Sequence, residues 1–264
     1  MNGVVALNKS FDRIADQYDR ARPTYPDSIF DRVIELAGID SAARVLEVGT
    51  GTGKATVPMA RRGFRILALE PGPSLAEIAR ARLVEYANVE VQTVSFEDWQ
   101  PPLDAFDLAF AAQAFHWLAP AERLPKFARV LRRAGTLAVF GNAEGVIARP
   151  LHDAIQAAYL QHAPSLGARS AARHAYGSEE SPLFQELRSS PLFTDAHAEF
   201  TRWNRTFSSD DYCALLATYS DHSTLPPTQL RDLSSSVARA IDERGGTVAV
   251  EYRTGLFLAR AAER

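Results

Sequence analysis

The sequence has a single cysteine, Cys213, among its 264 residues. One cysteine cannot form an intramolecular disulfide, so Cys213 is expected to be a small buried apolar side chain in a reducing compartment. The formal net charge of −3 provides no basic excess for nucleic acid or for an anionic membrane surface. No segment reaches the length of an apolar membrane span, and residues 1–10 lack the apolar core of a signal peptide. These absences predict a cytoplasmic protein, monomeric or homodimeric, that acts on a small molecule and contacts neither nucleic acid nor membrane.

Metal-binding and nucleophile motifs are missing as well. The six histidines show no His-x-x-x-His pattern and no carboxylate cluster with ligand spacing, so no metal is predicted. No serine lies in a Gly-x-Ser-x-Gly motif, and Gly53-Lys54-Ala55 lacks the Ser or Thr that completes a phosphate-binding P-loop. Metal-dependent hydrolysis, serine hydrolysis and P-loop chemistry are therefore not expected.

Three glycines at alternating positions are the clearest feature that the sequence does contain. Residues 44–48, a short apolar run that also contains Arg44 and Glu47, are followed by Gly49, Gly51 and Gly53. This pattern predicts a buried strand that turns sharply around a ligand, because glycine reaches positive φ and lets the backbone approach a bound molecule. A dinucleotide-binding turn has a further glycine three residues after its second, where this chain has Lys54. On the glycines alone, a generic nucleotide-binding turn stays open.

The motif Glu-x-Gly-x-Gly-x-Gly, which begins at Glu47, resembles the first motif of class I S-adenosylmethionine (SAM)-dependent methyltransferases. The resemblance implies that SAM is the cofactor and that Glu47, Gly49, Thr50, Gly51 and Gly53 contact it. A carboxylate at Glu47 also favours a ligand with a sulfonium and an ammonium group over the pyrophosphate of NAD. Acidic strand ends occur in dinucleotide sites too, so Glu47 favours SAM without excluding NAD.

Strand-like and helix-like segments alternate over residues 43–140. Near-continuous apolar strands separated by helices predict a parallel sheet with helices on both faces. Pro58 fits only a first helical turn, so the helix after the glycines should begin near Thr56. The expected strands are residues 43–48, 64–70, 89–94, 106–112 and 136–140, and the expected helices are residues 56–62, 74–86 and 121–132.

The C-terminal part has a different pattern. Helices expected over residues 149–162 and 179–188 interrupt the alternation and suggest a substrate cap. Strands expected over residues 197–206 and 248–258, with helices over 209–219 and 226–244, predict an antiparallel pair at one sheet edge. We therefore expect a single α/β domain, residues 1–264, with a Rossmann-like, seven-stranded, mostly parallel sheet. Its expected parts are an N-terminal lid (1–40), a SAM-binding core (41–142), a helical cap (143–193) and C-terminal strands and helices (194–264).

Two further candidate contacts follow the second and third strands. Glu70 ends the second strand just before Pro71, about twenty residues after the glycines, where a carboxylate can accept both hydrogens of a ribose diol. The turn Ser95-Phe96-Glu97 follows the third strand, at the position of the methyltransferase adenine site. Many methyltransferases have an acid where this chain has Ser95, whose hydroxyl can still accept from the adenine amino group. Glu97 can equally face solvent.

The fourth strand ends in the run Gln113-Ala114-Phe115-His116-Trp117. This run resembles the fourth motif of small-molecule methyltransferases similar to trans-aconitate methyltransferase. The resemblance implies that Gln113, Phe115 and His116 line the cofactor. His116 is the candidate catalytic residue, because it can orient the acceptor or take a proton near neutral pH. A structural histidine bonded to the backbone is the alternative.

The N-terminal segment contains a helical pattern from Ser10 to Tyr18, followed by Arg22, Pro23 and Tyr25. Packing and surface ion pairs can explain these side chains. The segment also resembles the methyltransferase pattern Phe-Asp, Tyr-Asp, Arg-Pro-x-Tyr-Pro, which implies a lid whose Tyr18, Arg22 and Tyr25 reach the amino-acid end of SAM.

Together these features predict methyl transfer from SAM to an O, N or C nucleophile of a small molecule, with S-adenosylhomocysteine (SAH) as the product. Two other functions stay open. An NAD-dependent oxidoreductase is disfavoured by the absent third glycine, and a SAM-binding regulatory protein without catalysis is compatible with the lack of an unambiguous base.

Overall fold

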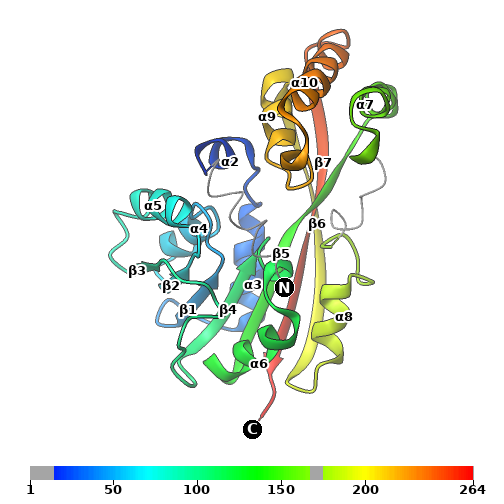
Figure 1. Ribbon diagram of the computed structural model, residues 1–264. Helices are drawn as coiled ribbons and strands as arrows, with labels where there is room; N and C mark the ends of the chain where they lie inside the picture. Colours follow the sequence, from blue (N-terminus) through cyan, green and yellow to red (C-terminus); the bar gives the residue numbers. More distant parts are fainter. Residues whose placement is uncertain (1–14, 167–174, 264) are drawn as a thin grey trace. The chain divides into compact units, whose positions relative to one another are not determined.

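The computed structural model describes residues 15–166 and 175–263 (Figure 1). These residues form two compact units. The sheet unit comprises residues 24–143, 175–201 and 254–263, and the helical unit comprises residues 15–23, 144–166 and 202–253. The expected start of the first helix, at Ser10, lies outside the described residues. The expected division into lid, core, cap and C-terminal part remains a prediction.

The strands form one seven-stranded sheet in the order β3-β2-β1-β4-β5-β7-β6. β1 pairs in parallel with β2 and β4, β2 with β3, and β4 with β5. The strand bounds are β1 Arg44–Val48, β2 Arg65–Leu69, β3 Val89–Gln92, β4 Phe106–Ala112, β5 Leu131–Ile147, β6 Phe193–Ser208 and β7 Thr247–Ala261. The expected seven-stranded, mostly parallel sheet is confirmed.

β7 is the antiparallel strand of this sheet. β5 and β6 begin in the sheet unit and continue into the helical unit, whereas β7 begins in the helical unit and ends in the sheet unit. Because β7 lies between β5 and β6, it runs opposite to both neighbours, as its arrow in Figure 1 shows. The antiparallel pair expected at the sheet edge is therefore β7 with β6.

Helices cover both faces of the sheet in the sheet unit. On one face, α3 (Asp27–Ala37), α4 (Thr56–Arg61) and α5 (Pro73–Arg82) contribute buried side chains to a common core. On the other face, α6 (Pro120–Val130) and α8 (Pro182–Ser189) pack around Phe127 and Phe184. Burial of apolar side chains in these two layers excludes water from both sides of β1 and β4, which leaves only their ends for polar chemistry.

The helical unit has a core of its own. Buried side chains from α7 (Arg149–His162), α9 (Ser209–Ala217) and α10 (Pro227–Asp242) pack with the start of β7. The short helix α2 (Ala15–Ala21) packs against α9. Within this unit, His222 is fully buried and its Nδ1 and Nε2 lie 2.7 Å from the Asp221 carboxylate and the Tyr159 hydroxyl.

β5 is much longer than the five-residue strand expected from the sequence. It begins at Leu131, directly after α6, and contains a bulge where Ala134 has φ 56°. The sequence did not indicate this first part, because the exposed charged residues Arg132 and Arg133 interrupt the apolar run that predicts a strand.

Among the described residues, no helix is both long and apolar enough to cross a membrane.

Candidate functional site

The glycine turn connects β1 to α4 and lies beside the end of β2. Gly49, Gly51 and Gly53 have φ of 75°, 58° and 82°. The amides of Gly49 and Thr50 both donate to the Leu69 carbonyl, at 2.9 and 3.1 Å. These bonds fix the turn at the carboxyl ends of two adjacent parallel strands, where ligands of open α/β sheets bind. α4 begins at Thr56, as Pro58 predicted.

The three glycines differ in the space around them. A Cβ on Gly49 would lie 2.5 Å from the Ala114 Cβ, so this glycine permits close packing of the turn against the end of β4. A Cβ on Gly53 would make ordinary contacts with Leu83 and Ala79 on α5. A Cβ on Gly51 would meet nothing within 4 Å. Gly51 is therefore the position where open space lies directly against the backbone.

Glu47 is a buried acid next to this turn. Its side chain is 0 % exposed, and neither carboxylate oxygen has a hydrogen-bond partner of good geometry among the described residues. Burial raises the pKa of Glu47 to about 8, although the nearby Thr56 and Thr50 hydroxyls favour the charged form. Those two hydroxyls bond each other. A buried acid without such bonds is costly when ionised, so Glu47 is suited to meet a cation.

Glu70 ends β2 and is 6 % exposed. One of its oxygens accepts from the Gly51 amide at 2.8 Å and the other from the Gly72 amide at 2.9 Å. Gly72 is the N-cap of α5. Glu70 thus joins the glycine turn to the next helix, while Pro71 beside it is exposed.

The turn after β3 contains side-chain hydrogen bonds of its own. The Ser95 hydroxyl donates to the Asp98 carboxylate at 2.7 Å and accepts from the Asp98 amide at 3.0 Å. Phe96 and Trp99 are buried in the core, where the Phe96 ring lies 4.5 Å from that of Phe127. Glu97 is exposed and accepts from the Ala119 amide at 3.0 Å. Trp99 is therefore a core residue.

Gln113 follows β4 with φ 56°, an unusual value for a residue other than glycine. Its side-chain oxygen accepts from the Asn142 amide at 2.8 Å, and its nitrogen donates to the Asn142 carbonyl at 3.4 Å. Strained backbone of this kind persists where the surroundings determine it, and such positions cluster at functional sites. The sequence gives no signal for Asn142, which lies on β5.

Phe115 and His116 begin a short 3-10 turn, Phe115–Trp117. Phe115 is 0 % exposed and its ring packs near Phe127 at 6.0 Å, so it has a core position and no surface for a ligand. His116 is half-buried, and its Nδ1 lies 3.1 Å from the Tyr176 hydroxyl. Burial raises the pKa of Tyr176 well above its usual range, so the phenol keeps its hydrogen.

The Tyr176 contact determines which nitrogen of His116 carries hydrogen. The buried phenol needs an acceptor, and His116 Nδ1 is the acceptor that the described residues place within hydrogen-bond distance. A neutral imidazole that accepts at Nδ1 carries its hydrogen on Nε2. In this form the Nε2 atom of His116 is a donor and not a base.

Tyr176→Phe is expected to remove the preference of His116 for the tautomer with hydrogen on Nε2. In the ¹⁵N NMR spectrum of neutral His116, wild type should show hydrogen on Nε2, whereas the variant should show both tautomers. The loss of one hydroxyl leaves the apolar ring and its packing against Phe257 in place. An unchanged spectrum would mean that another contact sets the tautomer. His152, exposed and remote in the sequence, provides the reference signal.

The expected lid residues fall in different units. Tyr25 lies in the sheet unit, where its ring packs edge-on against Phe140 at 5.2 Å. Tyr18 and Arg22 lie in the helical unit, where Arg22 donates to the Thr218 carbonyl at 2.8 Å. The structure thus brings the glycine turn, Glu47, Glu70, the Gln113 turn and Tyr25 together in one unit. The roles of all these residues toward SAM remain predictions.

The comparison with protein families agrees with this geometry. Residues 45–135 match the family described as methyltransferase domain. Over these residues the chain is similar to class I SAM-dependent methyltransferases. An uncharacterized methyltransferase of Mycobacterium tuberculosis is 36 % identical over 138 residues, which cover 52 % of this chain and 53 % of that protein. A methyltransferase-like protein of Schizosaccharomyces pombe is 32 % identical over 135 residues, 51 % of this chain and 52 % of that protein. The match thus spans about half the length of each relative.

Solved structures share the methyltransferase fold over most of the chain. A candidate type II methyltransferase from Anaeromyxobacter dehalogenans has a TM-score of 0.64 at 21 % identity and covers 92 % of this chain and 99 % of its own. Phosphoethanolamine N-methyltransferase 2 of Haemonchus contortus, solved with phosphomonomethylethanolamine and SAH, has a TM-score of 0.58 at 11 % identity, covering 98 % of this chain and 59 % of that one. The [4+2]-cyclase SpnF has a TM-score of 0.54 at 18 % identity, covering 92 % and 84 %.

Proposed function

We propose that this methyltransferase transfers a methyl group from SAM to an O, N or C nucleophile of a small molecule and releases SAH. One observation carries the proposal: the open backbone at Gly51 lies in a turn flanked by the buried Glu47 and by Glu70. The proposal includes a site similar to that of trans-aconitate methyltransferase-like proteins, and a cytoplasmic monomer or homodimer. It includes no metal.

The chemistry of Glu47 fits a cationic ligand. Bound SAM supplies a methyl group on a positively charged sulfonium, and its amino-acid end carries an ammonium group. A cation close to Glu47 would favour the ionised carboxylate and lower the pKa that burial raises. NAD would instead bring a negative pyrophosphate close to the buried Glu47, where the two negative charges would repel each other.

Glu70 fits the ribose of SAM. Its two oxygens accept from the Gly51 and Gly72 amides. Each carboxylate oxygen has two lone pairs, so an oxygen that accepts from an amide can also accept from a hydroxyl of a ribose diol. The two amide bonds orient the carboxylate before the ligand binds, which reduces the entropic cost of the contact.

His116 would orient the acceptor by donating a hydrogen bond from Nε2. Because the sulfonium is a good leaving group, the protein needs chiefly to align the nucleophile with the methyl group and to exclude water. A carboxylate or an acidic hydroxyl suits this arrangement, since it requires no base. The half-buried His116 then acts through geometry rather than through proton transfer.

Calorimetric titration with SAM, SAH and NADH tests the cofactor assignment. Wild type should bind the two adenosyl compounds with micromolar affinity, and Glu70→Ala should weaken that binding by about tenfold or more because it removes a charge-assisted acceptor. Glu77→Ala, on the exposed side of helix α5 that follows Glu70, should bind like wild type. Binding of NADH alone would exclude the methyltransferase proposal and support the oxidoreductase.

A SAM-binding protein without methyl transfer is the second candidate function. The observation that favours it is the Tyr176 contact, which leaves His116 without a basic Nε2. The fold does not decide the chemistry by itself, because SpnF shares it and is a cyclase. Transfer of a labelled methyl group to any member of a panel of small carboxylic acids, phenols and amines would support catalysis. SAH binding without transfer to any member would support the second candidate.

A further inference from the structure

Helix α6 carries a cationic residue at every third position: Arg123, Lys126 and Arg129. Residues three apart lie near one another on a helix, but these three differ in burial. Arg123 is 6 % exposed, Lys126 is half-buried and Arg129 is exposed. The first two make several hydrogen bonds to backbone carbonyls, and they hold two different loops of the sheet unit.

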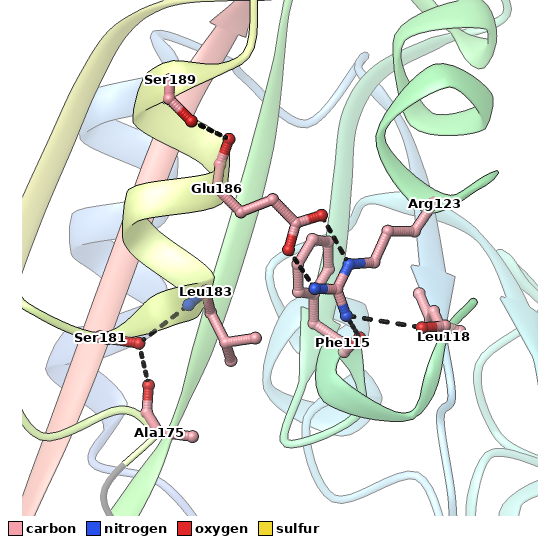
Figure 2. Close-up of polar contacts among 8 residues, drawn as sticks. All are labelled: Phe115, Leu118, Arg123, Ala175, Ser181, Leu183, Glu186 and Ser189. Atoms are coloured by element: carbon pink, nitrogen blue, oxygen red, sulfur yellow. Dashed lines mark hydrogen bonds and ion pairs between the residues drawn. The ribbon is translucent and has the colours of Figure 1, made fainter. Parts of the chain in front are cut away.

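Arg123 holds the turn that contains His116. Its Nη1 donates to the Phe115 carbonyl at 2.9 Å and to the Leu118 carbonyl at 3.4 Å, so it contacts the turn on both sides of His116. The guanidinium carbon lies 4.3 Å from the centre of the Phe115 ring. Figure 2 shows both carbonyls facing the guanidinium.

Glu186 of α8 fixes the orientation of Arg123. The Arg123 Nε donates to one Glu186 oxygen at 2.9 Å, and Nη2 bonds the other oxygen, which makes a two-pronged ion pair (Figure 2). A planar guanidinium in such a pair has one defined orientation. The ion pair therefore directs the remaining Nη1 toward the two carbonyls of the His116 turn.

Lys126 holds the turn after β3. Its Nζ donates to the Glu97 carbonyl at 2.9 Å and to the Trp99 carbonyl at 2.7 Å, and it lies 5.1 Å from the centre of the Phe96 ring. This is the turn that the sequence assigns to the adenine side of SAM. The amide of Ala119, the N-cap residue of α6, also donates to the Glu97 carboxylate at 3.0 Å.

We propose that Arg123 and Lys126 are positioning residues that make α6 a common support for the two loops facing the adenosyl group. Arg123 sets the His116 turn and Lys126 sets the turn at residues 95–99. This inference rests on the proposed function for the identity of the ligand. The contacts themselves require no ligand, because they join α6 to main-chain carbonyls of the protein.

Three methionine variants test the inference: Arg123→Met, Lys126→Met and Arg129→Met. Methionine keeps an unbranched side chain and removes every donor, and Arg129→Met is the matched control because it removes an exposed charge from the same helix. Hydrogen exchange of the SAH-free protein is measured by NMR at the amides of Trp117 and Leu118 and at those of Asp98 and Trp99. The first pair donates within the His116 turn, and the second pair donates to Ser95.

Exchange should accelerate about tenfold or more in one turn only for each variant. Arg123→Met should affect Trp117 and Leu118, Lys126→Met should affect Asp98 and Trp99, and Arg129→Met should affect neither pair. Equal acceleration at both turns, or none at either, would overturn the inference. If Arg123→Met does not fold, Lys126→Met decides the test by the same criterion, together with Lys126→Arg, which keeps a cationic donor and should retain most of the protection.

Titration with SAH separates this inference from the proposed function. Wild type and Arg129→Met should bind SAH equally, whereas Arg123→Met and Lys126→Met should bind it about tenfold more weakly. If wild type does not bind SAH, the proposed function fails while the exchange pattern still decides whether α6 supports the two turns. If wild type binds SAH and neither methionine variant weakens it, the support has no role in binding.

Discussion

Glu47→Gln is expected to stabilise the ligand-free protein at pH 8 and to abolish its binding of SAM. The carboxyl group of Glu47 is fully buried without a hydrogen-bond partner of good geometry among the described residues, so its ionisation is costly. Glutamine has nearly the same shape and never ionises. The variant therefore avoids that cost and loses the negative charge that a cationic ligand requires.

The pH dependence of this effect has a defined sign. Burial raises the pKa of Glu47 from 4.5 to about 8, so the folded protein holds a proton that the unfolded chain releases. The resulting stabilisation is complete below pH 4.5 and is lost as the pH rises through 8. Each pKa unit corresponds to about 1.4 kcal/mol, which makes the loss several kcal/mol in wild type and absent in the variant.

Urea unfolding at pH 5 and at pH 8 measures the first effect, and calorimetry with SAM measures the second. Wild type and Glu47→Gln should have similar free energies of unfolding at pH 5 and should diverge at pH 8. Wild type should also bind SAM more tightly as the pH rises from 6 to 8, with release of a proton. Equal pH profiles for both proteins would show that Glu47 is ionised in the ligand-free fold.

Gly51→Ala is expected to fold and to lose SAH binding by about a hundredfold. Gly51 has φ 58°, and a Cβ there meets no protein atom within 4 Å. The substitution therefore costs only the strain of a left-handed alanine, about 1 kcal/mol. The new methyl group projects into the open space that we assign to the ligand, where a clash prevents the close approach of backbone and adenosyl group.

Gly38→Ala is the matched control for this experiment. Gly38 has φ 65° at the end of α3, and its Cβ would likewise meet nothing within 4 Å. Both variants should lower the melting temperature by a similar few degrees, and only Gly51→Ala should weaken SAH binding in the titration. Equal affinities for SAH in both variants would place the ligand elsewhere than against Gly51.

The sequence predicted the order of strands and helices because the strands β1, β2 and β4 of the parallel part are largely buried on both faces. β4 is an example: its seven residues are apolar apart from Asp107, and the structure gives the bounds expected from that run. The first part of β5 and the first part of β6 were not predicted. Arg132 and Arg133 at one start, and Thr194 and Asp195 at the other, lie on exposed segments whose pattern indicates no strand.

The site was predictable where one short segment supplies both the backbone shape and the side chain. The three glycines all adopt positive φ, and Glu70 lies at the strand end that its position indicated. Contacts between distant segments were not predictable. Tyr176 contacts His116, which lies 60 positions earlier in the chain, and Glu186 contacts Arg123, which lies 63 positions earlier, with no motif to connect them. The burial of Phe115 followed from α6, whose Phe127 and Arg123 enclose its ring.

Gln113 has a consequence for how a strand can end beside a ligand. Its side-chain amide accepts from the Asn142 amide and donates to the Asn142 carbonyl, two main-chain groups that two successive peptide groups of a continuing parallel strand would bond. The side chain thus takes the place of those peptide groups and pairs β5 at Asn142 while the main chain turns away. Glutamate lacks the donor and leucine lacks both groups, so an amide is the functional group that lets β4 end early without exposing the edge of β5.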